Sequence, residues 1–264
     1  MYLIRPAILL TTALVLAACG SSATTSPAES ATGTTGVGSR PTGSITVFAA
    51  SSLKGSFTTL GAQFMAANPG TSITFSFGAS STLATQITQK APADVFASAS
   101  QKTMDTVTTA GAATGDKVFA VNTLEIATPT KPTTPVTSLA DLAKPSVKVV
   151  VCQKDVPCGV AAASLFTKNK LTVTAVSEEV DVKSVLSKIV LGEADAGIVY
   201  VTDVKAAKDT VVGVEIPADQ NVTTKYPIAP ITASTNTALA QAFVDYVLSA
   251  DGQSVLSAAG FASP

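Results

Sequence analysis

Short β-rich runs alternate with helical repeats of apolar residues from Ser44 onward, and this alternation constrains the fold more than any other feature of the sequence. Runs of β-branched residues predict strands, whereas apolar residues three and four positions apart predict helices. Repeated strand–helix units predict an α/β fold with a mainly parallel sheet, helices on both faces, and ligands at the carboxyl ends of the strands. In the first series we expect strands at 45–49, 73–77 and 94–97, with helices carrying Leu53, Phe57, Leu60 and Phe64, then Leu83 and Ile87, then Met104 and Val107.

A second series of the same kind predicts a second α/β lobe. If the C-terminal helical patterns return to the first lobe, the runs 121–127 and 226–231 cross between the lobes and form a hinge beside a cleft. We therefore expect lobe I to comprise residues 44–121 and 232–264, and lobe II to comprise residues 122–231. The other elements expected in this series are strands at 147–151 and 197–201, helices near 159–168 and 181–191, and an extended run at 211–216.

The N-terminal residues predict export from the cytoplasm. An apolar stretch, residues 7–18, follows Arg5 and is too short for a permanent membrane-spanning helix, so residues 1–18 are expected to be a signal peptide. The sequence Leu16-Ala17-Ala18-Cys19 is similar to the lipobox of bacterial lipoproteins. This similarity implies a lipid on Cys19 that holds the protein at the outer face of the cell membrane. The alternative is an ordinary secretory signal followed by an unrelated cysteine.

The segment after the cysteine predicts a tether. Residues 20–43 consist almost wholly of Ser, Thr, Ala, Gly and Pro, which offer little apolar area to bury. We therefore expect residues 19–43 to be a flexible linker that keeps the folded domain near a membrane partner. No second apolar segment is long enough to cross a bilayer, so the domain itself is expected to be soluble.

The composition excludes several classes of function. The chain contains 17 Lys plus Arg against 18 Asp plus Glu, so there is no basic excess for binding nucleic acid. It contains no histidine, which removes Ser-His-Asp and Cys-His catalysis and most transition-metal sites. Hydrophobic residues make up 46% of the chain, which is ample for a packed core.

Two cysteines remain after Cys19. In an oxidising compartment Cys152 and Cys158 could close a short loop as a disulfide. The alternative, a metal site, would need more ligands than two thiols, and the neighbouring residues supply no obvious ones. We expect the disulfide.

Hydroxyl groups gather where two predicted strands of the first series lead into helices. These junctions are Ala49-Ala50-Ser51-Ser52-Leu53 and Phe77-Gly78-Ala79-Ser80-Ser81-Thr82-Leu83. A helix start presents free N–H groups and roughly half an elementary positive charge, and a serine O–H adds a donor, so both junctions are candidate anion sites. The alternative is that the serines merely cap the helices.

The second series offers matching features. Helix starts are expected at Val156-Pro157-Cys158-Gly159 and at Glu179-Val180-Asp181-Val182, and their N–H groups could complete a cage around an anion. Tyr200 ends the apolar run Gly197-Ile198-Val199-Tyr200, where its phenol could donate to a bound oxygen. Ordinary packing is the alternative for an isolated tyrosine at a strand end.

Several motifs together resemble the periplasmic molybdate-binding proteins, which have the two-lobed fold of type II periplasmic binding proteins. The resemblance begins at Ile45-Thr46-Val47-Phe48-Ala49-Ala50-Ser51-Ser52-Leu53 and extends to the end of the chain, with the motifs in the order and close to the spacing of that family. The further motifs are Ser80-Ser81-Thr82-Leu83, Ala91-Pro92-Ala93-Asp94-Val95-Phe96, Val156-Pro157-Cys158-Gly159, Gly197-Ile198-Val199-Tyr200 and Tyr226-Pro227-Ile228.

The resemblance implies a binding protein that captures molybdate or tungstate and delivers it to an ABC permease in the cytoplasmic membrane. It implies no enzymatic activity and no cofactor, and we expect a monomer. By motif position the oxyanion is held by the hydroxyls of Ser52 and Ser80, the N–H groups of Cys158 and Val182, and the hydroxyl of Tyr200. Position 158 is usually a small residue such as alanine in that family, so Cys158 departs from the pattern while keeping the backbone donor.

A cage of hydroxyl and N–H donors without formal charge selects by protonation state. A tetrahedral dianion accepts at every oxygen, whereas a protonated phosphate brings a donor that finds no acceptor. Sulfate has the same charge and shape as molybdate, so a binding protein for sulfate or another small oxyanion is the nearest alternative. An enzyme with Ser52 or Ser80 as nucleophile lacks an activating histidine. A purely structural lipoprotein would gain no stability from molybdate.

Overall fold

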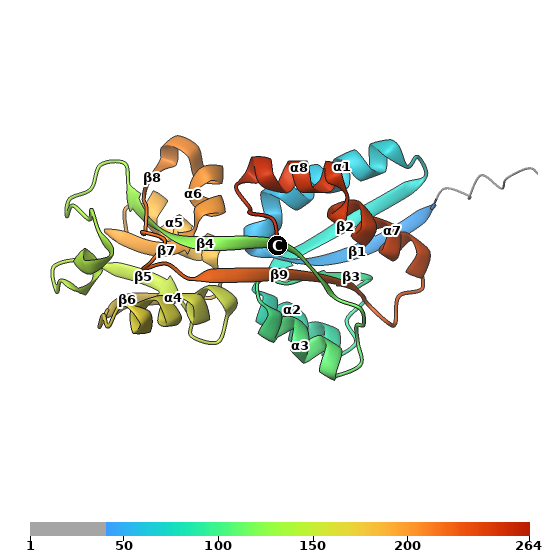
Figure 1. The fold of residues 1–264 in the computed structure, drawn as a ribbon, viewed down its shortest axis with the longest axis horizontal. Helices are drawn as coiled ribbons and strands as arrows, with labels where there is room; N and C mark the ends of the chain where they lie inside the picture. Colours follow the sequence, from blue (N-terminus) through green and yellow to red (C-terminus); the bar gives the residue numbers. More distant parts are fainter. Residues whose placement is uncertain (1–40) are drawn as a thin grey trace, which may run out of the picture. The chain divides into compact units, whose positions relative to one another are not determined.

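The structure, a computed structural model, describes residues 41–264. This part of the chain forms two α/β lobes joined by two long strands (Figure 1). The predicted signal peptide, the lipidation site Cys19 and all but the last residues of the predicted linker lie outside the described residues. Among the helices between residues 41 and 264, none has the length and apolar character needed to cross a membrane.

Lobe I contains the first predicted series. Its three parallel strands are hydrogen-bonded in the order β2-β1-β3, and Val47 of β1 pairs with both Phe75 and Val95. In Figure 1 the helices α1, α7 and α8 lie on one side of this sheet and α2 and α3 on the other. The elements of lobe I are β1 Gly43–Ala50, η1 Ser51–Leu53, α1 Lys54–Ala67, β2 Thr71–Gly78, α2 Ser80–Thr88, β3 Val95–Ala97, α3 Gln101–Thr109, α7 Thr237–Leu248 and α8 Ala250–Ala259.

Lobe II repeats the arrangement. Its parallel strands are ordered β7-β5-β6, and α5 and α6 lie on the opposite side of the sheet from α4 (Figure 1). The elements of lobe II are η2 Leu139–Ala143, β5 Val149–Cys152, α4 Pro157–Lys168, β6 Ala175–Glu179, α5 Val182–Val190, β7 Ala196–Tyr200, α6 Val201–Ala207, η3 Lys208–Thr210 and β8 Val211–Val214.

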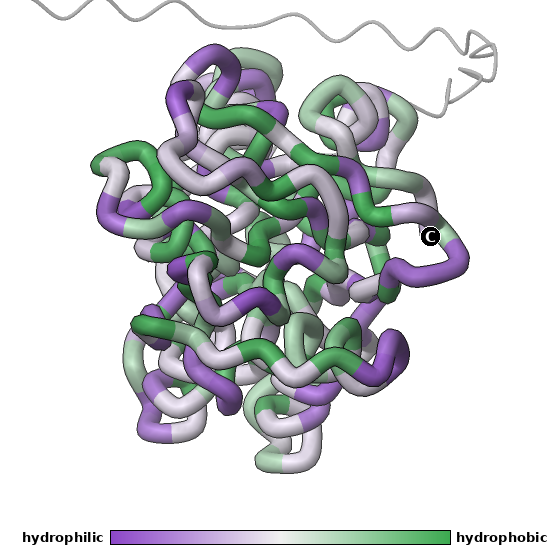
Figure 2. The backbone as a smooth tube through the Cα atoms, turned by 90° about the vertical axis from the view of Figure 1, so that its left-hand side faces the viewer, coloured by the Kyte–Doolittle hydropathy of each residue, from purple (hydrophilic) through white to green (hydrophobic). Residues whose placement is uncertain are grey.

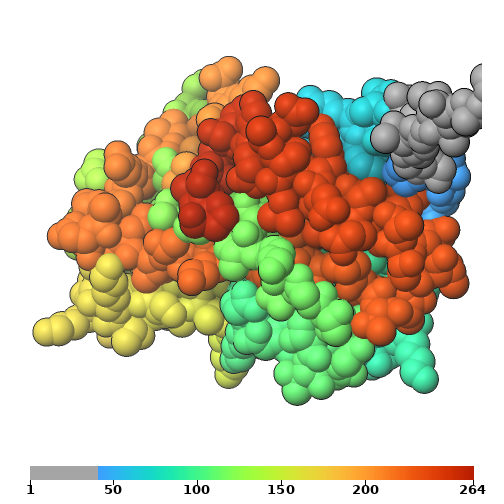
Figure 3. Space-filling view, turned by 45° about the vertical axis from the view of Figure 1, so that its right-hand side comes forward, coloured from blue at the N-terminus to red at the C-terminus, as the bar shows by residue number. Residues whose placement is uncertain are grey.

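Two strands connect the lobes, at the positions where the sequence predicts crossings. β4, Lys117–Pro129, and β9, Thr223–Pro230, pair with each other in antiparallel fashion. β9 also pairs with β3 of lobe I, whereas β4 also pairs with β7 and β8 of lobe II. Both strands therefore pass from one lobe to the other as a two-stranded hinge. The C-terminal residues lie against this hinge through a bridge between Val121 and Ala262, seen in Figure 3 as the dark red end beside the green segment.

Each lobe has its own hydrophobic core. In lobe I the predicted helical residues Leu53, Phe57, Leu60 and Phe64 are at most 3% exposed. Phe57 and Phe64 pack edge-on against Phe243 of α7, which explains the return of the C-terminal helices to lobe I. Figure 2 shows hydrophobic and hydrophilic segments alternating along the chain, as a layered α/β arrangement requires.

Several elements differ from expectation. The predicted strand 197–201 ends at Tyr200, because Val201 begins the short helix α6, where the Asp203 carboxylate accepts the Tyr200 N–H at 3.1 Å. Because apolar residues continue across this junction, the sequence does not indicate where the helix starts. The sequence also did not predict η2, η3 or the edge strand β6, whose alternating half-buried and exposed residues include two glutamates.

Candidate anion-binding site

All five predicted ligand-binding residues line one cavity between the lobes. Ser52 and Ser80 come from lobe I, and Cys158, Val182 and Tyr200 come from lobe II. None of the five is more than 7% exposed, so the candidate donors are largely shielded from solvent. Its volume is about 10 Å³, which is about the room that one water molecule needs. The cavity therefore has no room for a sugar or an amino acid.

Helix starts surround this cavity. The helical segments that begin at Ser51, Ser80 and Pro157 have no side-chain cap in the described structure, and their N-cap residues are Ala50, Ala79 and Val156, so the serines are not N-caps. Uncapped helix starts leave N–H groups available to an anion. Helix starts from both lobes thus meet at the cavity. Its lining residues are Ala50, Ser51, Ser52, Gly78, Ala79, Ser80, Ala99, Val156, Pro157, Cys158, Asp181, Val182 and Tyr200.

The two serine hydroxyls are held in place by neighbours. Ser80 Oγ accepts the Ala99 N–H at 3.0 Å, so the hydroxyl proton of Ser80 remains free to donate. Ser52 Oγ lies 3.0 Å from Tyr226 Oη. Burial raises the pKa of Tyr226, which keeps its phenol protonated and able to donate to Ser52. Both serines can therefore direct an O–H toward a bound anion.

Of the side-chain donors of the site, the hydroxyl of Tyr200 has the fewest hydrogen bonds. Its side chain is 1% exposed, and within residues 41–264 its hydroxyl has no hydrogen-bond partner. Burial raises the pKa of Tyr200 well above its usual value, so the phenol remains a donor. An unpaired buried donor costs about 1–3 kcal/mol. A bound acceptor at this position would remove that cost.

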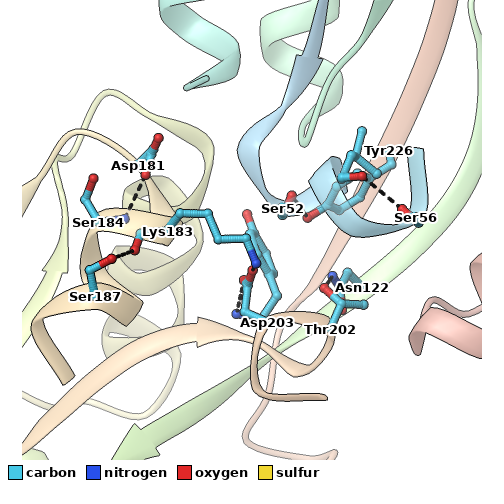
Figure 4. Close-up of polar contacts among 12 residues, drawn as sticks. Ser52, Ser56, Asn122, Asp181, Lys183, Ser184, Ser187, Thr202, Asp203 and Tyr226 are labelled. Carbon is cyan, nitrogen blue, oxygen red and sulfur yellow. Dashed lines mark hydrogen bonds and ion pairs between the residues drawn. The ribbon is translucent and has the colours of Figure 1, made fainter. Parts of the chain in front are cut away.

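The charged groups around the cavity are already engaged. Asp181 lines the cavity, but its carboxylate caps α5 by accepting the Ser184 N–H at 2.9 Å. Lys183 extends from α5 to Asp203, with Nζ 2.7 Å from Oδ1 (Figure 4). Burial raises the pKa of Asp203, and the Lys183 ammonium opposes that shift. An anion in the cavity would consequently meet mainly dipoles.

Cys152 and Cys158 are joined by a disulfide in the structure. The bridge connects the end of β5 to the first turn of α4, next to the backbone donor of Cys158. The following residue must be glycine, because a Cβ at Gly159 would lie 1.8 Å from the Gln153 carbonyl oxygen. This loop is therefore tightly wound beside the cavity.

The residues that hydrogen-bond to donor residues of the site and orient them were not predicted from the sequence. Tyr226 appeared only within a motif, because its partner Ser52 is 174 positions away and the contact exists only in the folded chain. Asp203 lies in the helix that was not predicted. The partner of the Ser80 hydroxyl is a backbone group, the Ala99 N–H, and such a partner cannot be predicted from residue types.

A two-lobed α/β fold with a donor-lined cavity between its lobes is typical of a solute-binding protein. The chain belongs to the family of bacterial extracellular solute-binding proteins, whose sequence profile matches residues 45–262. It is 44% identical over 250 residues to the molybdate-binding protein ModA of Mycobacterium tuberculosis, with 94% of this chain and 93% of that protein covered.

Two solved structures share the fold. The periplasmic molybdate-binding protein of Azotobacter vinelandii matches with a TM-score of 0.74 and 22% identity, covering 83% of this chain and 99% of that one. The sulfate-binding protein SubI of Mycobacterium tuberculosis matches with the same TM-score of 0.74 and 17% identity, covering 83% and 86%. Since these two proteins are named for different anions, the fold alone does not identify the ligand.

Proposed function

We propose that this protein captures molybdate, and tungstate as its close analogue, between its lobes and delivers the anion to an ABC importer. The observation that carries the proposal is the closed cavity in which Ser52, Ser80 and Tyr200 meet two helix starts of lobe II. The similarity to a molybdate-binding protein over 94% of the chain supports the choice of anion. Micromolar to nanomolar binding requires about 8–12 kcal/mol. Several charge-assisted hydrogen bonds in a dry cavity can supply it.

The donors of the cage also support selection among anions. A fully deprotonated tetrahedral dianion can accept from every donor, whereas the proton on a phosphate would lack an acceptor in the cage. Asp181 is the carboxylate nearest the cavity, and its acceptor capacity is used in part by Ser184. Between sulfate and molybdate the choice rests on size, because the two ions have equal charge and shape.

Closure of the lobes is the event that we propose the permease recognises. The cage needs donors from both lobes, so an anion binds the closed form better than the open form and shifts the population toward it. Direct contacts between α5 of lobe II and η1 of lobe I support this mechanism, since they join the two walls of the site. We propose that the moving parts are residues 44–121 with 232–264 and residues 122–231.

Catalysis is not part of the proposal. Ser52 lies beside a phenol whose pKa is raised, and Ser80 accepts a backbone N–H, so neither serine is activated by a base. We further propose that the protein is a monomer, anchored by a lipid on Cys19 at the outer face of the cell membrane. The support for the anchor is the lipobox-like sequence before Cys19.

Calorimetric titration of the mature chain, made without its lipid, tests the proposed function. Molybdate and tungstate should bind with micromolar or tighter affinity and raise the melting temperature. Phosphate should have no effect, and sulfate should bind at least about tenfold more weakly, because its smaller oxygen tetrahedron reaches fewer donors. Equal affinity for sulfate and molybdate would instead indicate a general oxyanion-binding protein.

A further inference from the structure

A large groove opens onto the anion-binding cavity from one side of the cleft. It has a volume of about 550 Å³ and lies between α1 and α8 of lobe I and α5 and α6 of lobe II. Ser52 lines both the groove and the cavity, so the groove leads directly to one of the proposed anion donors. An anion that reaches the cage from this side passes along the walls of the groove.

The groove carries charge of one sign. Its lining includes Lys183, Lys205 and Lys208 and no aspartate or glutamate. Lys183 is paired with Asp203, whereas Lys205 and Lys208 are exposed and take part in no ion pair within the described residues. In a chain with a formal net charge of −1, this groove is a local positive region.

The opposite opening of the cleft is different. It is smaller, about 200 Å³, and lies between α2 and α3 of lobe I and the start of α4 in lobe II. Its lining contains one lysine, Lys102, and one aspartate, Asp155, so its formal charges cancel. It reaches the cavity at Pro157, which has no N–H to offer. The two approaches to the cage are therefore electrostatically unequal.

We propose that the groove lined by Lys205 and Lys208 is the access route of the anion, and that these two lysines attract the dianion before the lobes close. This inference rests on the proposed function. A cleft lined by charges of one sign raises the local concentration of the opposite ion and its association rate. Neither lysine lines the closed cavity, so both act on the encounter and not on the bound complex.

Stopped-flow kinetics can separate an effect on the encounter with the anion from an effect on the bound complex. The chain has no tryptophan, and Tyr200 lines the cavity, so tyrosine emission of the mature chain can report molybdate binding. In Lys205→Gln/Lys208→Gln the association rate constant for molybdate at low ionic strength should fall about 3- to 10-fold. The dissociation rate constant should stay unchanged. In 0.5 M salt, where the Debye length is only a few ångströms, the association rate of the variant should approach that of the unaltered chain.

Lys102→Gln is the matched control, since Lys102 is equally a surface lysine but lines the opposite opening. It should change the association rate less than about twofold, because Lys102 lies away from the proposed access route. An equal loss in Lys102→Gln, no loss in the double variant, or a change confined to dissociation would overturn the access route while leaving the proposed function intact. Failure of the unaltered chain to bind molybdate would overturn the proposed function, and this inference with it.

Discussion

At the scale of single residues, Tyr226 links the parts of the candidate site. It belongs to the crossing strand β9 and is fully buried. Its hydroxyl lies 3.0 Å from Ser52 of lobe I, and its ring packs edge-on against Tyr200 of lobe II with the centroids 5.9 Å apart. One side chain of the hinge therefore touches a proposed donor from each lobe.

Tyr226→Phe should weaken molybdate binding by about 1 kcal/mol, because the substitution removes the hydrogen bond that orients the Ser52 hydroxyl. Calorimetry measures the change. Tyr246→Phe is the control, since that hydroxyl donates to Gln63 outside the cavity. An unchanged affinity in Tyr226→Phe would show that Ser52 needs no orientation from the hinge.

Ser52→Ala and Ser80→Ala should each weaken molybdate binding by about 1–3 kcal/mol without unfolding the protein, because each removes one O–H donor from a buried anion. Ser81→Ala provides the comparison, as Ser81 follows Ser80 but lines the opposite opening of the cleft and not the cavity. Titrations that give the same affinity for both cavity variants as for the unaltered chain would remove these serines from the site.

At the scale of secondary-structure elements, the buried carboxylate of Asp203 fixes two walls of the cavity. It accepts the Tyr200 N–H at the junction of β7 and α6, and it pairs with Lys183, which follows Val182 at the start of α5. Two of the three lobe II elements that carry proposed donors, β7 and α5, are thereby held to one group. Removing the Lys183 ammonium leaves the buried Asp203 carboxylate uncompensated.

Lys183→Met should make stability depend strongly on pH. Without the ammonium, burial raises the pKa of Asp203 further, so the native state binds more protons than the unfolded state above the ordinary aspartate pKa of about 3.9. Stability should therefore fall as pH rises from about 4 through the raised native pKa. Melting temperatures across this range measure the trend, and adding Asp203→Asn should abolish it. If the melting temperature of Lys183→Met alone does not change with pH, the role assigned to the Lys183–Asp203 pair is contradicted.

Reduction of the disulfide should destabilise the lobe II wall of the site. Closing a loop of this length contributes about 2–3 kcal/mol, and Cys152 and Cys158 are six positions apart. The double variant Cys152→Ala/Cys158→Ala should therefore melt at a lower temperature than the unaltered chain. Thiol titration of an unreduced chain without Cys19 should find no reactive thiol, whereas two reactive thiols would rule out the bridge.

The sequence predicts elements well where one periodicity dominates. The heptad-like spacing of Leu53, Phe57, Leu60 and Phe64 leads to α1, and all four residues are buried. Prediction fails where apolar residues continue through a change of element, as at Tyr200 and Val201, or where a strand is half exposed, as in β6. The types of donor could be inferred from helix starts, but the neighbours that orient them depend on contacts between distant segments.

At the scale of the whole molecule, the two hinge strands are hydrogen-bonded to each other and to an element next to the site. The crossing strands β4 and β9 are hydrogen-bonded to each other between the lobes, and Asn122 of β4 donates to Thr202 of α6 at 2.9 Å (Figure 4). In the mechanism that we propose, movement of the lobes would adjust these contacts. Closure would then be coupled to binding, and a small ion could change the surface offered to a permease.

A crystal structure of the molybdate-soaked protein, measured at the molybdenum absorption edge, tests the central claim most directly. The account predicts one strong anomalous peak between the lobes, with oxygens about 2.7–3.1 Å from the hydroxyls of Ser52, Ser80 and Tyr200 and from the nitrogens of Cys158 and Val182. A molybdenum peak outside this cavity, or contacts from one lobe alone, would contradict it.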